Sequence, residues 1–353
     1  MLKEVVVYGA GKTGKKLFRH LKENGIDVLC FIDRNHPGRL NDKTVYDLKS
    51  IPPSLLQEHV ILALHDDVLG AAQSLKQLGF SFLHSLADIN LLLETSGKKV
   101  FQYGPLDSSN LITDNDMHSL KSILADDISR DIVECFCSYI KTGRLEFLRQ
   151  HDSGPMYFSD NRPYECNGPM VYIDCGAFTG DTVEILNDHL KLDTVVAFEP
   201  DPQVFSVLRK NLKKILPNDT KVFTLATAVG EKNTILSFCT AQDGTASISE
   251  TGTVKVPVSS LDELFINQPV DFIKMDIEGS EKDALNGAKG IIMQYSPLLA
   301  ISTYHKMRDF FGVPALIHRL NPKYKLYLRS HNDSFHDTVC YAVPERFLRK
   351  ADA

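Results

Sequence analysis

The hydrophobic residues in the first part of the chain fall into short runs separated by helical periodicity. Leu17, Phe18 and Leu21, between the first two runs, recur at the spacing of one helix face. The runs are rich in branched side chains, as expected of buried strands. They lie at 4–8, 26–33, 60–64 and 80–83. This alternation predicts a small Rossmann-like α/β domain over residues 1–95.

Residues 96–168 carry a different pattern. Stretches at 117–127 and 129–149 have helical periodicity with no strand between them. A segment rich in proline, glycine and asparagine follows and runs to residue 168. We therefore expect a helical connector and a loop here.

From residue 169 to 345 the alternation of strands and helices resumes. The predicted strands lie at 170–175, 194–199, 221–226, 234–239, 253–258, 270–276, 297–303, 323–329 and 338–343. The predicted helices are Asp181–Leu190, Gln203–Leu216, Glu281–Gln294 and 306–319. Two of these strands are short, and the last two form a hairpin pair. About seven main strands in one α/β unit are expected.

Length and composition narrow the function classes. The 353 residues suit two domains, and the 43% hydrophobic content is ordinary for a globular protein. The net charge of -6 argues against a nucleic-acid partner. No apolar run is long enough for a membrane span, and the N-terminus does not have the pattern of a signal peptide. We expect no membrane association.

The seven cysteines are scattered, and they form no CxxC pair. Neither a zinc ribbon nor a disulfide framework is indicated. We expect Cys135 and Cys137 to pack within a helix rather than to bind metal. A reduced, cytoplasmic setting fits this usage best.

Two glycine loops each follow a strand and precede a helix. The first contains Gly9, Gly11 and Gly14 at dinucleotide-fingerprint spacing, and Asp33 ends the next strand. Lysines surround this loop, which favours an anion such as pyrophosphate. A Rossmann-like turn that needs glycine only for packing has the same pattern, so both readings stay open.

The second loop has the opposite charge. It begins at Asp174 and ends at Asp181, with Gly176, Ala177 and Gly180 between them. Two carboxylates would repel a pyrophosphate but suit a positively charged ligand. The sulfonium and α-ammonium groups of S-adenosylmethionine meet that requirement.

An acidic residue also ends the strand after the second loop. Glu199 is followed by Pro200 and Asp201. A carboxylate at this place can accept hydrogen bonds from both hydroxyls of a ribose. Loop and acid together predict a cofactor site at the carboxyl ends of two adjacent strands.

Four segments resemble the FkbM-type methyltransferase family. They are VYIDCGAFTGDT, VVAFEPDPQVFSVLRKNL, VDFIKMDIEGSEKDALNGA and LAISTYHKMRDFFGVP, in this order. The resemblance covers residues 169–345. It implies a class I methyltransferase fold, a seven-stranded sheet with an antiparallel last strand, with S-adenosylmethionine as methyl donor. It also implies O-methylation of a hydroxyl on a sugar, glycan or secondary metabolite.

The resemblance also implies roles for particular residues. Asp174, Gly176, Gly180 and Glu199 would hold the cofactor. The turn Asp276-Ile277-Glu278-Gly279 would face the methyl group and the acceptor. Tyr157 and Phe158 resemble a stretch that precedes such domains and would lie over the cofactor. The N-terminal domain resembles, more loosely, the small nucleotide- or nucleotide-sugar-binding-like domains fused to some sugar-modifying enzymes.

A hydroxyl acceptor needs a base to remove its proton. His305 follows a predicted strand and should emerge at the same sheet edge, so it is the leading candidate, with Asp276 second. A purely structural histidine would look the same in sequence. Asp276, Glu278 and His305 could instead hold a divalent metal, but this strand-end pattern is common without one, and we do not favour it. Acids at a helix start, such as Glu281, need no functional explanation.

Together these patterns predict a methyltransferase acting on a small-molecule or glycan acceptor, with the question of a homo-oligomer left open. Two alternatives remain. One is a nucleotide-binding oxidoreductase that uses the first glycine loop. The other is a non-catalytic binding protein with a methyltransferase fold.

Overall fold

The computed structural model describes residues 2–102, 112–152, 154–239, 247–248 and 254–349. The chain forms two compact units. Unit 1 comprises Met1–Met117, Asp131–His151 and Asn332–His336, and unit 2 comprises His118–Arg130, Asp152–His331 and Asp337–Ala353. Both units draw on the predicted connector 96–168, so the boundaries expected at 95 and 168 do not coincide with the edges of the units. In the described part of the chain, no helix is long and apolar enough to cross a membrane.

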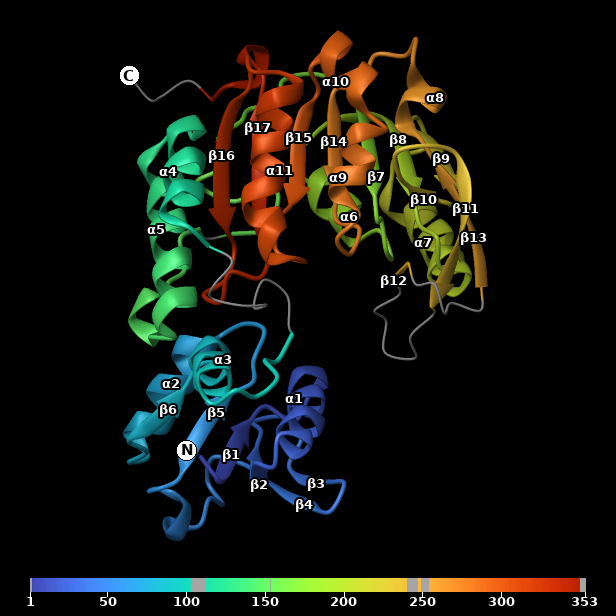
Figure 1. The fold of residues 1–353 in the computed structure, drawn as a ribbon. Coiled ribbons are helices and arrows are strands. Elements are labelled where there is room, and N and C mark those ends of the chain that lie inside the picture. Colours follow the sequence, from blue (N-terminus) through green and yellow to red (C-terminus); the bar gives the residue numbers. More distant parts are fainter. Residues whose placement is uncertain (1, 103–111, 153, 240–246, 249–253, 350–353) are drawn as a thin grey trace. The chain divides into compact units, whose positions relative to one another are not determined.

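Unit 1 is built on a six-stranded sheet with the order β3-β4-β2-β1-β5-β6 (Figure 1). The strands are β1 (Glu4–Tyr8), β2 (Asp27–Ile32), β3 (Gly38–Leu40), β4 (Lys43–Tyr46), β5 (His59–Leu62) and β6 (Phe82–His84). The central strand β1 is parallel to both β2 and β5. The helices are α1 (Lys12–Glu23), α2 (Val68–Gln77) and α3 (Leu86–Thr95). This confirms the predicted α/β organisation.

The sequence pattern missed the β3–β4 hairpin and α3. The three residues of β3 are exposed or half-buried, so they form no apolar run that could signal a strand. Helix α3 begins at a conventional cap, where the Ser85 hydroxyl accepts a hydrogen bond from the Asp88 amide. The two helices predicted in the connector are α4 (Asp114–Ile123) and α5 (Asp127–Thr142).

Unit 2 contains a seven-stranded sheet with the order β16-β17-β15-β14-β7-β8-β9. The strands are β7 (Met170–Cys175), β8 (Leu192–Phe198), β9 (Lys221–Leu225), β14 (Phe272–Met275), β15 (Leu298–Ser302), β16 (Lys325–Ser330) and β17 (Thr338–Val343). Strand β17 pairs antiparallel with both β15 and β16, and the other pairs are parallel. This confirms the predicted seven-stranded sheet with an antiparallel last strand.

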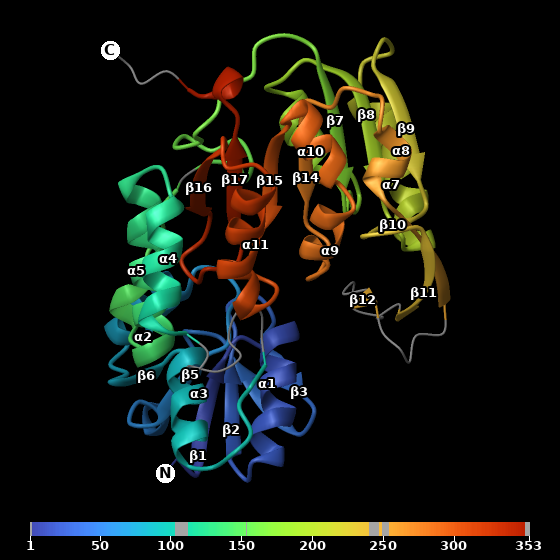
Figure 2. The ribbon, with the colours of Figure 1, turned by 45° about the horizontal axis from the view of Figure 1, so that its top comes forward.

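Helices pack against this sheet in two groups. The group α9 (Glu281–Asn286), α10 (Lys289–Tyr295) and α11 (Met307–Leu320) lies along one face (Figures 1 and 2). The helices α6 (Asp181–Asn187) and α7 (Pro202–Ile215) contact each other. Their crossovers run in the opposite direction along the sheet, so right-handed connections place them on the other face. A small sheet of β10 (Ala228–Val229), β11 (Thr234–Cys239), β12 (Ser247–Ile248) and β13 (Val254–Ser259), together with α8 (Leu261–Phe265), completes the unit.

The helix predicted over Glu281–Gln294 is wrong as one element, because it is broken between α9 and α10. Gly287 lies at the break, where an added Cβ would sit 2.1 Å from the Gly230 carbonyl oxygen. The Asp262 carboxylate accepts hydrogen bonds from the amides of Gly290 and Ile291, at 2.7 and 2.9 Å, and so caps the second helix. A distant side chain therefore supplies the cap that local sequence does not show.

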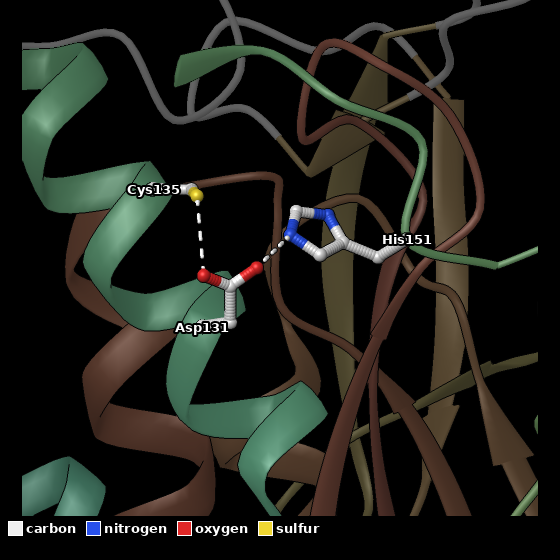
Figure 3. Close-up of side chains that lie close together, drawn as sticks. All are labelled: Asp131, Cys135 and His151. Atoms are coloured by element: carbon white, nitrogen blue, oxygen red, sulfur yellow. Dashed lines mark hydrogen bonds and ion pairs between the residues drawn. The ribbon is translucent and has the colours of Figure 1, made fainter.

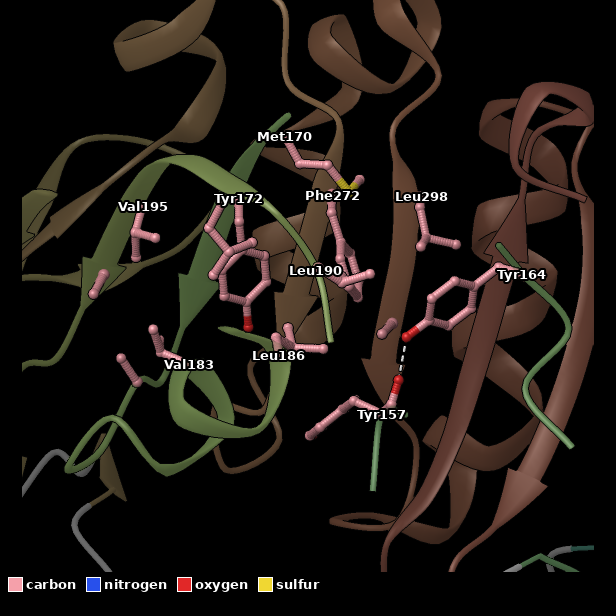
Figure 4. Close-up of a cluster of buried hydrophobic side chains, with 14 of the residues drawn as sticks. Tyr157, Tyr164, Met170, Tyr172, Val183, Leu186, Leu190, Val195, Phe272 and Leu298 are labelled. Atoms are coloured by element: carbon pink, nitrogen blue, oxygen red, sulfur yellow. Dashed lines mark hydrogen bonds between the residues drawn. The ribbon is translucent and has the colours of Figure 1, made fainter. Parts of the chain in front are cut away.

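Aromatic side chains lie among aliphatic ones in a hydrophobic core of unit 2 (Figure 4). The Phe272 ring lies 5.2 Å from the Tyr172 ring and 5.8 Å from the Tyr164 ring, centre to centre. The Tyr164 hydroxyl donates a hydrogen bond to the Tyr157 carbonyl oxygen. This bond fixes the segment before β7 against the sheet.

Candidate active site

Unit 2 contains a cavity of about 320 Å³ at the carboxyl ends of β7, β8 and β14. Its wall includes the residue that follows each of these strands, namely Gly176, Glu199 and Asp276. In open α/β sheets, ligands bind at this edge. The strand order therefore brings together residues that lie a hundred positions apart in the sequence.

Negative charge dominates the wall of this cavity. Five carboxylates line it, those of Asp181, Glu199, Asp201, Asp276 and Glu278. Among the described lining residues, only Lys274 carries an amine or guanidinium group. The arrangement suits a ligand with positive charge and hydroxyl groups better than a pyrophosphate.

The second glycine loop passes close to the end of β14. Gly176 has a φ of +78°, and an added Cβ would sit 2.0 Å from the Asp276 carbonyl oxygen. The amides of Gly176 and Ala177 donate to the Phe198 carbonyl oxygen at 3.0 and 2.9 Å. Gly180 has a φ of +91° and packs on Leu212. The glycines therefore set the turn, and of the glycines and Ala177 in this loop only Gly176 lines the cavity.

A buried ion pair stabilises the second glycine loop. Asp174 is fully buried, and its carboxylate lies 3.1 Å from the Lys274 amine. The same amine donates to the Gly176 carbonyl oxygen at 2.8 Å. Burial alone would lower the pKa of Lys274, but the carboxylates of Asp174 and Asp276 hold it above its usual value. Asp174 therefore acts through Lys274 and does not itself line the cavity.

Glu199 has both structural contacts and unused hydrogen-bonding capacity. One carboxylate oxygen accepts from the Asp201 amide at 2.8 Å, and the other accepts from the Phe178 amide at 3.1 Å. Burial raises the pKa of Glu199 to about 7, even though these two N–H groups lower it. Since each oxygen retains a lone pair beside the cavity, hydroxyl donors from a ligand would stabilise its charged form.

The neighbours predicted with Glu199 and Asp174 have local roles. Asp201 caps α7, accepting from the amides of Gln203 and Val204 at 2.8 and 3.1 Å. Pro200 lies between the two acids and lines the cavity. Asp181 is the first residue of α6 and contributes its carboxylate to the wall.

The side chains of Tyr157 and Phe158 contact different parts of unit 2. The Tyr157 hydroxyl donates to an Asp276 carboxylate oxygen at 3.3 Å, which connects the segment before β7 to the end of β14. The Phe158 ring stacks on the His189 ring at 4.1 Å, and the Arg162 guanidinium lies 3.9 Å from its centre. Neither Tyr157 nor Phe158 is part of the cavity wall, so their predicted position over the cofactor gains no support from the structure.

His305 lies within a group of acids behind the cavity wall. Its Nε2 atom is 3.3 Å from an Asp276 oxygen and 3.8 Å from a Glu278 oxygen. Its Nδ1 atom is 3.0 Å from an oxygen of the fully buried Glu281. The Tyr304 hydroxyl also donates to Asp276, at 3.2 Å. The three predicted catalytic residues His305, Asp276 and Glu278 are thus brought together.

The charge state of His305 does not suit a free base. Burial alone would lower its pKa, but the hydrogen bond and charge of Glu281, with the other carboxylates, raise it to about 9. At neutral pH the ring keeps its proton, and Asp276 stands between it and the cavity. The role of His305 as the base stays a prediction, and this geometry favours Asp276 instead.

The metal alternative involves a different set of ligands from the predicted one. Potential ligand atoms of Asp276, Glu281 and His305 lie within 4.8 Å of one another. Glu281 replaces the predicted ligand Glu278 in this set. Its other contacts are the amides of Ile277 and Gly279, at 2.9 and 3.3 Å, so it also fixes the turn after β14.

Sequence reasoning missed Lys274, Tyr304 and Glu281. Lys274 interrupts the apolar strand VDFIKMD, and a charge at a central strand position was a usable signal. Glu281 was set aside because acids are common at helix starts. Nothing in the local sequence shows that Tyr304 reaches Asp276, since that contact depends on the pairing of β14 with β15.

The first glycine loop, in unit 1, is shaped by its own packing. An added Cβ at Gly9 would sit 2.7 Å from the Ala63 carbonyl oxygen, and one at Gly14 would sit 1.9 Å from the Gly9 carbonyl oxygen. Gly11 has open space around it. Two of the three glycines are therefore required without any ligand.

Asp33 is also occupied within unit 1. Its carboxylate accepts from the amides of Ala10, Asn35 and His36, at 2.7, 2.8 and 3.0 Å. Burial alone would raise the pKa of Asp33, but these N–H groups hold it below its usual value. Unlike Glu199, this carboxylate is stabilised as an anion by the loop itself.

Comparison with known proteins decides the family of this site. Residues 174–335 match the model of the methyltransferase FkbM domain. These residues are a methyltransferase FkbM domain. The FkbM domain contains both acids of the cavity wall that follow β8 and β14, as well as the cluster around His305.

One solved structure agrees with this fold. A methyltransferase FkbM from Methylobacillus flagellatus KT aligns with a TM-score of 0.75 and 20% identity, covering 97% of this chain and 90% of that one. An rRNA methylase from Streptococcus thermophilus aligns at 14% identity with a TM-score of 0.34, covering 51% of this chain and 88% of that one. The second score is too low to support any argument, and the first supports the fold alone. No curated protein matches the chain.

The close approach at Gly176 predicts a strong effect of added volume. Gly176→Ala combines a left-handed backbone with a collision against the Asp276 carbonyl, so we expect a loss of several kcal/mol in the free energy of unfolding, against about 1–2 kcal/mol for backbone strain alone. Gly168→Ala is the control, because Gly168 has a φ of +104° but open space. Urea denaturation measures both, and equal losses would contradict the packing argument.

The raised pKa of His305 predicts a pH-dependent stability. A folded-state pKa of about 9 against 6.5 gives stabilisation that is complete below pH 6.5 and lost as the pH rises through 9. The difference amounts to about 3 kcal/mol. His305→Gln should lack this pH dependence, and His318→Gln, in the last turn of α11, should retain it. Unfolding free energies with the same pH dependence in wild type and His305→Gln would refute the assignment.

Proposed function

We propose that this protein is an S-adenosylmethionine-dependent methyltransferase that O-methylates a hydroxyl of a sugar, glycan or secondary metabolite. The FkbM domain supports the methyltransferase class. The observation that carries the cofactor is the acidic cavity at the carboxyl ends of β7, β8 and β14, with Glu199 in its wall. A cationic ligand that bears vicinal hydroxyls matches both features.

The residues of the cavity fit this cofactor. The ribose hydroxyls would donate to the free lone pairs of Glu199, and these bonds would stabilise the charged form that burial disfavours. The carboxylates of Asp181 and Asp276 would offset the positive charges of the ligand. Gly176 lines the cavity without a side chain, so a ligand can lie close to its backbone.

Asp276 is the residue best placed to receive the acceptor proton. S-adenosylmethionine, when bound, supplies a methyl group that its sulfonium already activates. The remaining tasks are alignment of the acceptor oxygen and removal of its proton as the new C–O bond forms. Asp276 lines the cavity, while Tyr157, Tyr304 and protonated His305 fix its orientation. His305 is therefore a positioning residue in this proposal.

Binding of S-adenosylhomocysteine should depend on the ionisation of Glu199. With a pKa of about 7, the charged fraction rises from about one tenth at about pH 6 to about nine tenths at about pH 8. The dissociation constant measured by calorimetry should therefore fall about tenfold across this range. Glu199→Gln should bind weakly at both pH values.

Glu184→Gln is the matched control, since it removes one charge from an exposed position of α6. It should keep both the affinity and the pH dependence of the wild type. A Glu199→Gln protein that binds S-adenosylhomocysteine as tightly as the wild type would remove the basis of the cofactor assignment.

Methyl transfer tests the reaction and the base. Tritiated S-adenosylmethionine is incubated with a panel of monosaccharides, glycans and polyols, and O-methylated product is expected with at least one of them. Asp276→Asn should lower the transfer rate about a hundredfold or more, since general-base catalysis typically contributes this much. Undiminished transfer by Asp276→Asn would exclude it as the base. Transfer only to nitrogen or carbon would contradict O-methylation.

A further inference from the structure

Three side chains of unit 1 meet at a site that the methyltransferase reaction does not use: Asp131, Cys135 and His151 (Figure 3). Asp131 and Cys135 lie one turn apart on the same face of α5. His151 follows the short 3-10 helix Leu145–Phe147 that comes after α5. One Asp131 oxygen is 3.1 Å from His151 Nε2, and the other is 3.8 Å from Cys135 Sγ.

The order of these groups does not suit a nucleophilic cysteine. In a Cys–His–Asp triad the imidazole stands between thiol and carboxylate, so that it can take the thiol proton. Here the carboxylate stands between the other two (Figure 3). Burial and the neighbouring Asp131 charge also raise the pKa of the Cys135 thiol, the opposite of what activation requires.

The same geometry is well suited to a metal ion. One potential ligand atom from each residue lies within 4.8 Å of the other two. Ligands of a tetrahedral zinc ion lie about 2.0–2.3 Å from the metal, which places them roughly 3.3–3.8 Å from one another. The two Asp131 oxygens lie 3.1 Å from His151 Nε2 and 3.8 Å from Cys135 Sγ, so each of these neighbours has a carboxylate oxygen near this spacing.

The three side chains of the cluster differ in their exposure to solvent. Cys135 is 3% exposed and the His151 side chain 5%, whereas the Asp131 side chain is 44% exposed. A metal could therefore enter from the Asp131 side and reach two buried ligands. The Arg149 guanidinium lies 3.5 Å from Asp131 and would have to give up this contact.

We propose that Asp131, Cys135 and His151 form a site for zinc or a similar borderline transition-metal ion. Sulfur, imidazole and carboxylate ligands together select such ions over magnesium or calcium. Three protein ligands leave a fourth position for water. The bound ion would link α5 to the segment after it, which gives the site a structural role separate from methyl transfer. Cys135 thereby differs from its neighbour Cys137, which supplies no ligand atom to the cluster.

Cobalt substitution tests this site in the full chain. Chelator-treated protein is titrated with Co²⁺, and a thiolate-to-cobalt charge-transfer band with the visible bands of tetrahedral cobalt is expected at one equivalent. Cys135→Ser should abolish the charge-transfer band, and His151→Gln should weaken Co²⁺ binding at least about tenfold. Cys137→Ser, two positions along the same helix, is the control and should retain both signals.

Zinc gives a second readout that does not depend on colour. Excess Zn²⁺ should raise the melting temperature of the wild type and of Cys137→Ser by several degrees, but not that of Cys135→Ser. Circular dichroism verifies that each variant is folded. Absence of the charge-transfer band in folded wild type, or its persistence in Cys135→Ser, would overturn the proposal. The cluster around His305 contains no thiol, so metal bound there cannot produce this band.

Discussion

The buried amine of Lys274 holds together the two strand ends on which the cavity depends. Lys274 and Asp174 lie directly opposite each other in the parallel pairing of β14 with β7. Their ion pair is fully enclosed, and the amine also binds the carbonyl of Gly176. A slip of one residue would leave both charges against apolar side chains, so the pair fixes the register as well as the loop. The close contact between Gly176 and Asp276 follows from that register.

The two glycine loops have similar sequences but differ in how the acid beside each loop is stabilised. For each loop, the acid at the end of the following strand accepts hydrogen bonds from a backbone amide of the loop and from backbone amides of its own turn. Asp33 receives three such bonds, and its anion is stabilised without a ligand. Glu199 receives two in a more buried place, and its pKa is raised instead. Only the second loop retains acceptor capacity beside a cavity lined by acids.

Much of the fold could be predicted from the sequence because long apolar runs alternate with amphipathic segments. The order of elements in unit 2 and the antiparallel β17 followed from that alternation and from the family resemblance. The β3–β4 hairpin was missed because it buries too little to leave a periodic pattern. The break after α9 was missed because Asp262, far away in sequence, supplies the cap.

The sequence predicted the site residues that directly follow strands, but not the residues that contact them from other elements. Glu199 and Asp276 were found because an acid after a buried strand is conspicuous. Glu281 was dismissed as a helix-start acid, although it is fully buried against His305. Glu281 keeps the His305 imidazole protonated at neutral pH, and this changes the choice of base. Such contacts arise from the pairing of distant elements, which a single sequence does not reveal.

The most direct test is a crystal structure of the protein grown with S-adenosylhomocysteine. The account predicts density for the ligand in the cavity of unit 2, with both ribose hydroxyls within hydrogen-bonding distance of the Glu199 carboxylate and the sulfur near Asp276. Ligand density at the first glycine loop instead, with the unit 2 cavity holding only water, would contradict the central claim.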